Sequence, residues 1–77
     1  MTLHELNAKI QEATIKQIAV QHQFDAILKL YEAATMMDSR PLMEQYRDQL
    51  HSLLDLKLDT VNEIMTFSRQ LIRLAGG

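Results

Sequence analysis

The first half of the chain carries one regular row of apolar residues. Its members recur at alternating steps of three and four residues, and they are Leu3, Leu6, Ile10, Ala13, Gln17, Val20, Phe24, Ile27, Tyr31 and Ala34. Gln17 is the one position that breaks the apolar row. This spacing is typical of a helix that packs lengthwise against another helix. We therefore predict a helix over residues 3–36.

The second half of the chain has a wider apolar surface. At about 100° per residue it forms an arc roughly 200° wide, and its centre is marked by Leu50, Val61, Ile64 and Leu71. One flank carries Leu54, Leu58, Met65 and Ile72, and the other carries Leu56, Phe67 and Leu74. The two flanks are equally apolar, so the pattern leaves open which of them faces the first helix. The other flank would be exposed, which is typical of an interface.

A short polar break separates the two apolar patterns. The single proline is Pro41, and the only glycines are the last two residues. Asp38 and Ser39 are suited to cap a following helix, and proline is suited to its first turn. We therefore predict a turn over 37–41 and a second helix over 42–75, which Gly76 and Gly77 end.

The start of the first helix is marked by Thr2 and Glu5. Their spacing fits a capping box, in which a hydroxyl and a carboxylate satisfy free amide hydrogens. Because the connection between the helices is short, they should run antiparallel. The predicted fold is an all-α, coiled-coil-like two-helix hairpin, with residues 1–77 as a single domain. We expect a second copy or a partner protein to complete it to a larger helical bundle.

Composition narrows the classes of partner. A chain of 77 residues is marginally stable alone, because a domain of this size buries only about 60% of its unfolded surface. There are no cysteines, which removes disulfides and thiolate zinc sites and favours the reducing cytoplasm. A net charge of -2 offers no electrostatic footprint for nucleic acid or an anionic membrane. We expect neither a membrane span nor a secretory signal, because no apolar run is long enough for the first and MTLHELNAKI lacks the pattern of the second.

Candidate chemistry is limited to one face of the second helix. Asp48, His51 and Asp55 share that face, which offers two carboxylates and an imidazole to a metal ion. Three ligands on a solvated face lack the buried support that a metal or catalytic site needs. Neither a glycine-rich phosphate loop nor a set of nucleophile and base is present. We therefore expect no enzyme activity, no metal and no cofactor.

The segment after the turn supports a family resemblance. Pro41-Leu42-Met43-Glu44-Gln45-Tyr46, followed by Leu50, resembles the needle subunits of type III secretion, and Asn62, Ile64 and Phe67 continue that likeness. The needle family has a two-proline turn and a polar N-terminal arm, whereas this chain has one proline and a capped helix from Thr2. An immediate N-terminal helix and a tyrosine early in the second helix resemble instead the small E-type chaperone family, which holds the needle subunit together with a larger co-chaperone.

The resemblance implies a function through burial of apolar surface. A chaperone of this family would cover a co-chaperone or an export substrate and keep a polymerising helix monomeric in the cytoplasm. The residues expected to make that contact are Leu53, Leu56, Phe67, Leu71 and Leu74. Two alternatives stay open: a homodimeric four-helix-bundle adaptor or regulator, and a polymerising subunit of the needle type.

Overall fold

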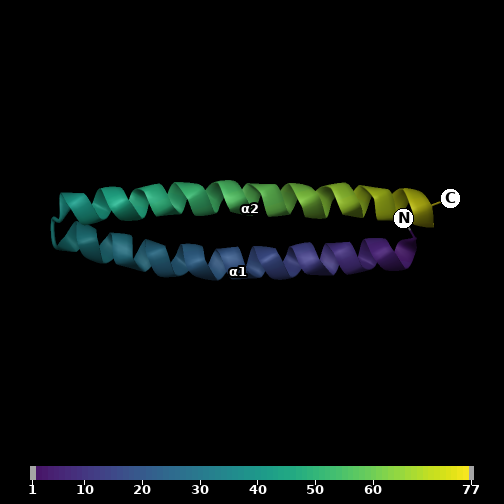
Figure 1. Cartoon of the computed structure of the whole chain (residues 1–77), viewed down its shortest axis with the longest axis horizontal. Helices are drawn as coiled ribbons and strands as arrows, with labels where there is room; N and C mark the ends of the chain where they lie inside the picture. Colours follow the sequence, from purple (N-terminus) through teal and green to yellow (C-terminus); the bar gives the residue numbers. More distant parts are fainter. Residues whose placement is uncertain (1, 77) are drawn as a thin grey trace.

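The computed structural model describes residues 2–76 and consists of two antiparallel helices (Figure 1). Helix α1 spans Leu3–Met36 and helix α2 spans Arg40–Ala75. Together they form a rod of 58 × 14 × 14 Å, with both ends of the chain at the same end of the rod. The predicted all-α helical hairpin is confirmed.

The first helix begins with a side-chain cap. The hydroxyl oxygen of Thr2 accepts a hydrogen bond of 3.2 Å from the backbone N–H of Glu5. This bond is the hydroxyl half of the predicted capping box, and it satisfies one of the amide hydrogens that a helix start leaves free.

The turn closes α1 with two backbone hydrogen bonds that run backwards into the helix. The N–H of Ser39 donates to the carbonyl of Ala34 at 3.0 Å, and the N–H of Asp38 donates to the carbonyl of Thr35 at 3.1 Å. This pair of bonds is the Schellman motif, which needs a left-handed residue after the helix. Asp38 takes that role with a φ of 54°.

The second helix starts at Arg40, two residues before the expected start at 42. Pro41 lies in the first turn, where its missing N–H would have no helical partner in any case, so the helix extends back over it. At the other end, the N–H of Gly76 donates to the carbonyl of Ile72 at 2.8 Å. The expected role of Gly77 lies outside the described residues.

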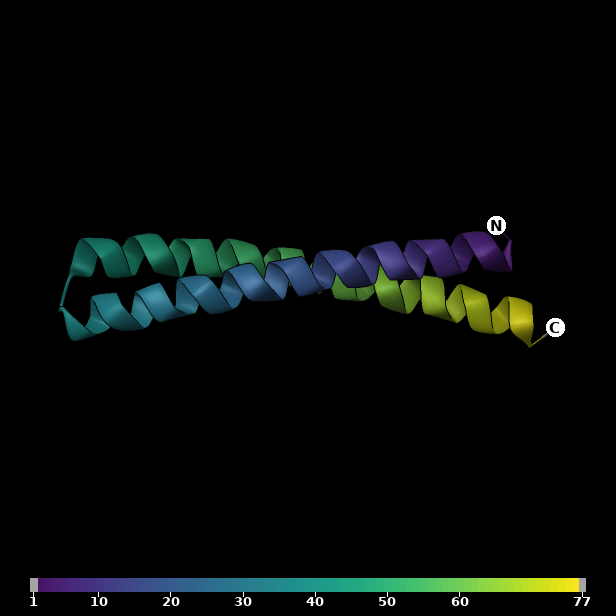
Figure 2. The same cartoon turned by 90° about the horizontal axis from the view of Figure 1, so that it is seen from below.

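One lengthwise interface holds the helices together, and we call it the hairpin seam. From α1 it contains the row predicted from the sequence, in which Leu6, Ala13, Val20 and Ala34 are buried. From α2 it contains residues at the same alternating steps, all buried or partly buried: Met43, Tyr46, Leu50, Leu53, Lys57, Thr60, Ile64, Phe67 and Leu71. The helices cross near the middle of the rod (Figure 2), as a repeat of seven residues requires if the seam is to stay between them.

Candidate functional site

The hairpin leaves one apolar row of α2 facing away from α1. We call this row the outer strip: Leu54, Leu58, Val61, Met65 and Ile72. Each member directly follows a residue of the hairpin seam, and from Leu54 to Ile72 this row is interrupted only at Ser68. Nearer the turn the same row is polar and consists of Glu44, Arg47 and His51. Leu54 is 44% exposed, Leu58 54%, Met65 46% and Ile72 69%, while Val61 is partly buried. This flank of the predicted arc therefore faces away from α1, whereas on the other flank Phe67 is partly buried and Leu56 and Leu74 are exposed.

The equivalent row of α1 is polar. Its members also directly follow the residues of the seam, and only Ile18 and Leu28 are apolar among His4, Asn7, Gln11, Thr14, Ile18, Gln21, Asp25, Leu28, Glu32 and Thr35. The two helices therefore differ in what they offer to a partner. A helix seeking apolar contact on this side of the rod finds it on α2.

The residues predicted to bind a partner lie mainly along the opposite side of α2. Leu53, Phe67 and Leu71 are partly buried members of the hairpin seam. Leu53 and Ile27 line one hollow, and Phe67 and Ala13 line another. These seam residues already use part of their apolar surface within the hairpin, and their binding of a partner stays a prediction.

Two further predicted residues, Leu56 and Leu74, are exposed. Leu56 lines a hollow beside Val20 and Thr60, and Leu74 lines one beside Leu6. The structure therefore places four of the five predicted residues along one shallow groove between the helices, and Leu71 within the seam.

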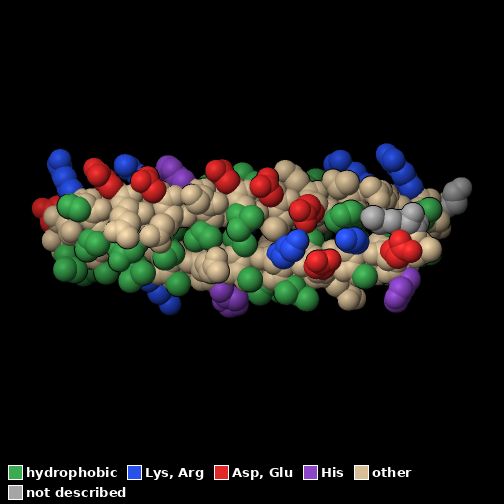
Figure 3. Space-filling view, in the orientation of Figure 1, with side chains coloured by type: hydrophobic (Ala, Val, Ile, Leu, Met, Phe, Trp, Pro, Cys, Tyr) green, Lys and Arg blue, Asp and Glu red, His purple; other side chains and the backbone are tan. Residues whose placement is uncertain are grey.

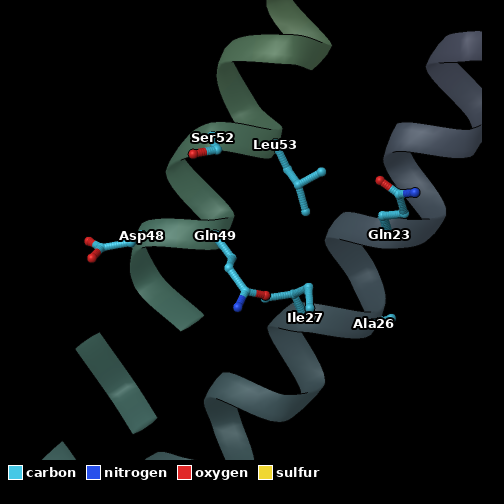
Figure 4. A pocket seen from close by; sticks show the side chains of 7 residues that line it. All are labelled: Gln23, Ala26, Ile27, Asp48, Gln49, Ser52 and Leu53. Atoms are coloured by element: carbon cyan, nitrogen blue, oxygen red, sulfur yellow. The ribbon is translucent and has the colours of Figure 1, made fainter. Parts of the chain in front are cut away.

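The largest hollow of this groove is open and mostly shallow. It has a volume of about 530 Å³ and is lined by Gln23, Ala26, Ile27, Asp48, Gln49, Ser52 and Leu53. In Figure 4 the side chains of Gln49 and Leu53 point towards α1, and that of Asp48 points away. The carboxylate therefore does not converge with other polar groups on a bound molecule.

Charged side chains interrupt the rest of the groove. The hollow beside Phe67 is lined by Lys9, Glu12, Lys16 and Glu63. On the face drawn in Figure 3, acidic and basic side chains lie together towards the end of the rod that carries the chain termini, and hydrophobic side chains gather nearer the turn. A partner helix that packed in this groove would have to remove water from these charged side chains, which costs free energy. A helix that packed on the outer strip would not.

One polar contact joins the two helices across the seam. The ammonium of Lys57 donates to the side-chain oxygen of Gln21 at 2.5 Å, and the side-chain nitrogen of Gln21 donates to a carboxylate oxygen of Asp25 at 2.9 Å. Thr60 is only 3% exposed, and its hydroxyl donates to the carbonyl of Lys57 at 2.8 Å. Polar groups in a helix seam fix its register. The regular steps from Leu50 through Lys57 to Ile64 are the signal in the sequence that could have assigned Lys57 to this seam.

The acidic face of α2 shows no arrangement of metal ligands. Asp48, His51 and Asp55 are all exposed. Among residues 2–76, no three His, Asp or Glu side chains gather closely enough to hold a metal ion. Neither α1 nor α2, over the stretch that the structure describes, combines the length and apolarity needed to cross a membrane.

Comparison with known proteins adds no relative. No family model, curated protein or solved structure matches this chain. Its function has to be argued from the two helices themselves.

Proposed function

We propose that this protein is a non-enzymatic helical interaction module that binds another polypeptide by packing the outer strip of α2 against a partner helix. The observation that carries the proposal is the strip itself, five apolar side chains in a row at the spacing of a helix seam, interrupted only at Ser68, with no helix of the described chain against them. The polar equivalent row on α1 supports the choice of α2 as the binding helix.

The small core of the hairpin supports the need for a partner. Within residues 2–76 the buried residues are Leu6, Ala13, Val20, Ala34 and Thr60, and Leu6 is the one large side chain among these five that is fully covered. A core of this size contributes little beyond the conformational entropy that folding loses. A further helix on the outer strip would enlarge this core.

The energy available at the strip is sufficient for specific binding. Fully burying one apolar side chain of this size contributes about 1.5 to 3 kcal/mol. Because the side chains of the outer strip are already about half covered within the hairpin, burying the rest of all five contributes about 4 to 7 kcal/mol. Residues of the partner contribute a similar amount, and association entropy subtracts from the total. Affinity in the micromolar range is therefore expected.

A narrower form of the proposal follows from the resemblance to the small type III secretion chaperones. In that case the module works in the cytoplasm, and the occupant of the strip is a helix of a co-chaperone or of an export substrate. The support for this form is the likeness of Pro41 to Tyr46 and Leu50, together with the apolar strip that such a chaperone needs. It predicts that a purified needle-type subunit stays monomeric in the presence of this protein and polymerises in its absence.

The general proposal is tested with paired baits in the native host. Two differently tagged copies of the chain are expressed together, and the copy that serves as bait is purified through its tag. Three baits are compared: the wild type, Leu58→Glu/Met65→Glu in the outer strip, and Ile15→Glu/Leu30→Glu on α1. The control pair also replaces two exposed apolar side chains, but on α1. Circular dichroism on each purified variant checks that the helices persist.

The expected result is a polypeptide retained in stoichiometric amount by the wild type and by the α1 control and lost from the strip variant. The retained polypeptide can be the second tagged copy or a different protein. Identical recoveries from all three baits would refute the proposal, because the strip would then contribute nothing to binding.

A further inference from the structure

The outer strip has an internal symmetry that bears on the identity of its partner. Position 63 lies midway between Leu54 and Ile72, and also midway between Val61 and Met65, while the fifth member, Leu58, has Ser68 as its mate. A twofold axis at this position would place each of these residues opposite its mate on an identical, antiparallel helix. Closed twofold pairing is the commonest form of self-association among soluble proteins.

We infer that the partner on the outer strip is a second copy of this chain, with the two α2 helices antiparallel about residue 63, so that two hairpins close into a four-helix bundle. This inference rests on the proposed function and names its partner. An antiparallel arrangement is also the one that each hairpin already uses between α1 and α2.

The charges beside the strip fit this register. The row that borders the strip on its solvent side carries Asp55, Asn62 and Arg69 at steps of seven residues, and all three side chains are exposed. The row is symmetrical about Asn62, within one residue of the centre of the strip. In the proposed dimer Asp55 therefore lies beside Arg69 of the second copy, twice by symmetry, and the two Asn62 side chains meet near the axis.

A parallel arrangement would reverse this complementarity. It would place Asp55 beside Asp55 and Arg69 beside Arg69, and like charges in contact oppose association. The antiparallel register is therefore the one that both the apolar spacing and the charges favour.

The exposed area of the hairpin is consistent with a dimer. The surface of the described chain is 5795 Å², whereas a compact monomer of this mass exposes about 4,800 Å². The excess of about 1,000 Å² is similar to the area of about 800 Å² that each partner buries in a stable interface. One further helical hairpin is the size of partner that can cover it.

The first test is the solution mass of the wild-type protein by light scattering over a concentration series. We expect a dimer at micromolar concentration, and Leu58→Glu/Met65→Glu should shift it to monomer while the helical spectrum persists. A wild type that stays monomeric at every concentration would overturn the inference. In that case the paired-bait experiment separates the two proposals. If the wild-type bait retains a different protein and the strip variant does not, the proposed function stands, but the partner is not a second copy of this chain.

The second test exchanges the charges. Asp55→Arg should weaken the dimer about tenfold or more, because two attractive contacts become repulsive. Adding Arg69→Asp should restore the affinity to near that of the wild type. The matched control is Asp59→Arg, which is also exposed but lies about 40° further round the helix from the strip, and it should change the affinity less than about threefold. Equal effects of Asp55→Arg and Asp59→Arg, or no rescue in the double variant, would overturn the register.

The third test uses the absence of cysteine from the chain. Asp55→Cys and Arg69→Cys variants are mixed, refolded together and oxidised. The antiparallel register predicts a disulfide-linked heterodimer from the mixture and little linked product from either variant alone. Efficient linkage of Asp55→Cys to itself would indicate a parallel pair and would overturn the inference.

Discussion

The turn offers the sharpest test of the hairpin geometry, because one side chain there adopts a conformation that only glycine tolerates freely. Asp38 has a φ of 54°, and its position lets the N–H groups of Asp38 and Ser39 donate to the carbonyls of Thr35 and Ala34. A left-handed conformation costs an ordinary L residue about 1 to 2 kcal/mol, and aspartate somewhat less. Replacing Asp38 with glycine or with alanine therefore changes this cost in opposite directions.

The magnitude follows from two opposed terms. Relative to alanine, glycine at position 38 avoids the steric cost of about 1 to 2 kcal/mol but loses about 0.5 to 1 kcal/mol through the greater freedom of the unfolded chain. Asp38→Gly should therefore be about 1 kcal/mol more stable than Asp38→Ala, with the wild type between them. For a domain of this size that difference moves the melting temperature by about 4 to 8 °C.

The assay is thermal and urea unfolding followed by circular dichroism at one fixed protein concentration, since self-association also shifts the midpoint. The control is the same pair of substitutions at Lys29, which is exposed and lies inside α1, two turns before its end. There alanine should be the more stable by about 0.5 to 1 kcal/mol, because glycine is unfavourable inside a helix. If alanine is at least as stable as glycine at position 38 as well, the left-handed turn is wrong.

Three further predictions concern the seam. A double-mutant cycle of Lys57→Met and Gln21→Leu should give a coupling energy of about 0.5 to 1.5 kcal/mol in the free energy of unfolding. The reason is that the hydrogen bond from Lys57 to Gln21 carries a charge but is only partly buried. A coupling energy near zero would show that this contact contributes nothing to stability. Ala13→Leu should lower the unfolding free energy by about 1 to 3 kcal/mol, because Ala13 is only 2% exposed. Ala8→Leu, at an exposed position of the same helix, should change it by less than about 0.5 kcal/mol, and equal effects in urea unfolding would contradict this packing. Leu6→Ala should cost about 2 to 5 kcal/mol, since Leu6 is fully buried, and an unchanged urea midpoint would mean that this end of the hairpin is open.

The first helix could be predicted from the sequence because its apolar residues form a single narrow row. Only one row is available to face a partner, so the pattern determines both the helix and its buried side. The second helix could not be assigned in this way. Its arc is wide enough for two rows, and the row that packs on α1 includes the polar residues Lys57 and Thr60.

What selects the row on α2 is tertiary geometry. The turn from Ala34 to Met43 fixes how far α2 is rotated when it returns along α1, and the left-handed residue at Asp38 is part of that turn. Sequence patterns record how apolar each row is, but not this rotation. The helix start at Arg40 was missed for a related reason, because proline is compatible with the first turn but does not require the helix to begin after it.

The distribution of polar residues between the two rows of α2 gives a physical reason for this choice. Over the whole of α2 the seam row is the more apolar, with seven apolar members of nine, whereas the row of the outer strip continues towards the turn as Glu44, Arg47 and His51. Hydrophobic burial therefore favours the observed seam. The alternative pairing would place α1 on the row of the outer strip. In that alternative Lys57 would lose the oxygen of Gln21, and Thr60 would leave the most buried position of α2. Polar contacts in a seam lower its stability but exclude other registers. The hairpin therefore forms through the row that is apolar over most of α2 and that also carries the specific polar contacts, and it leaves the outer strip exposed.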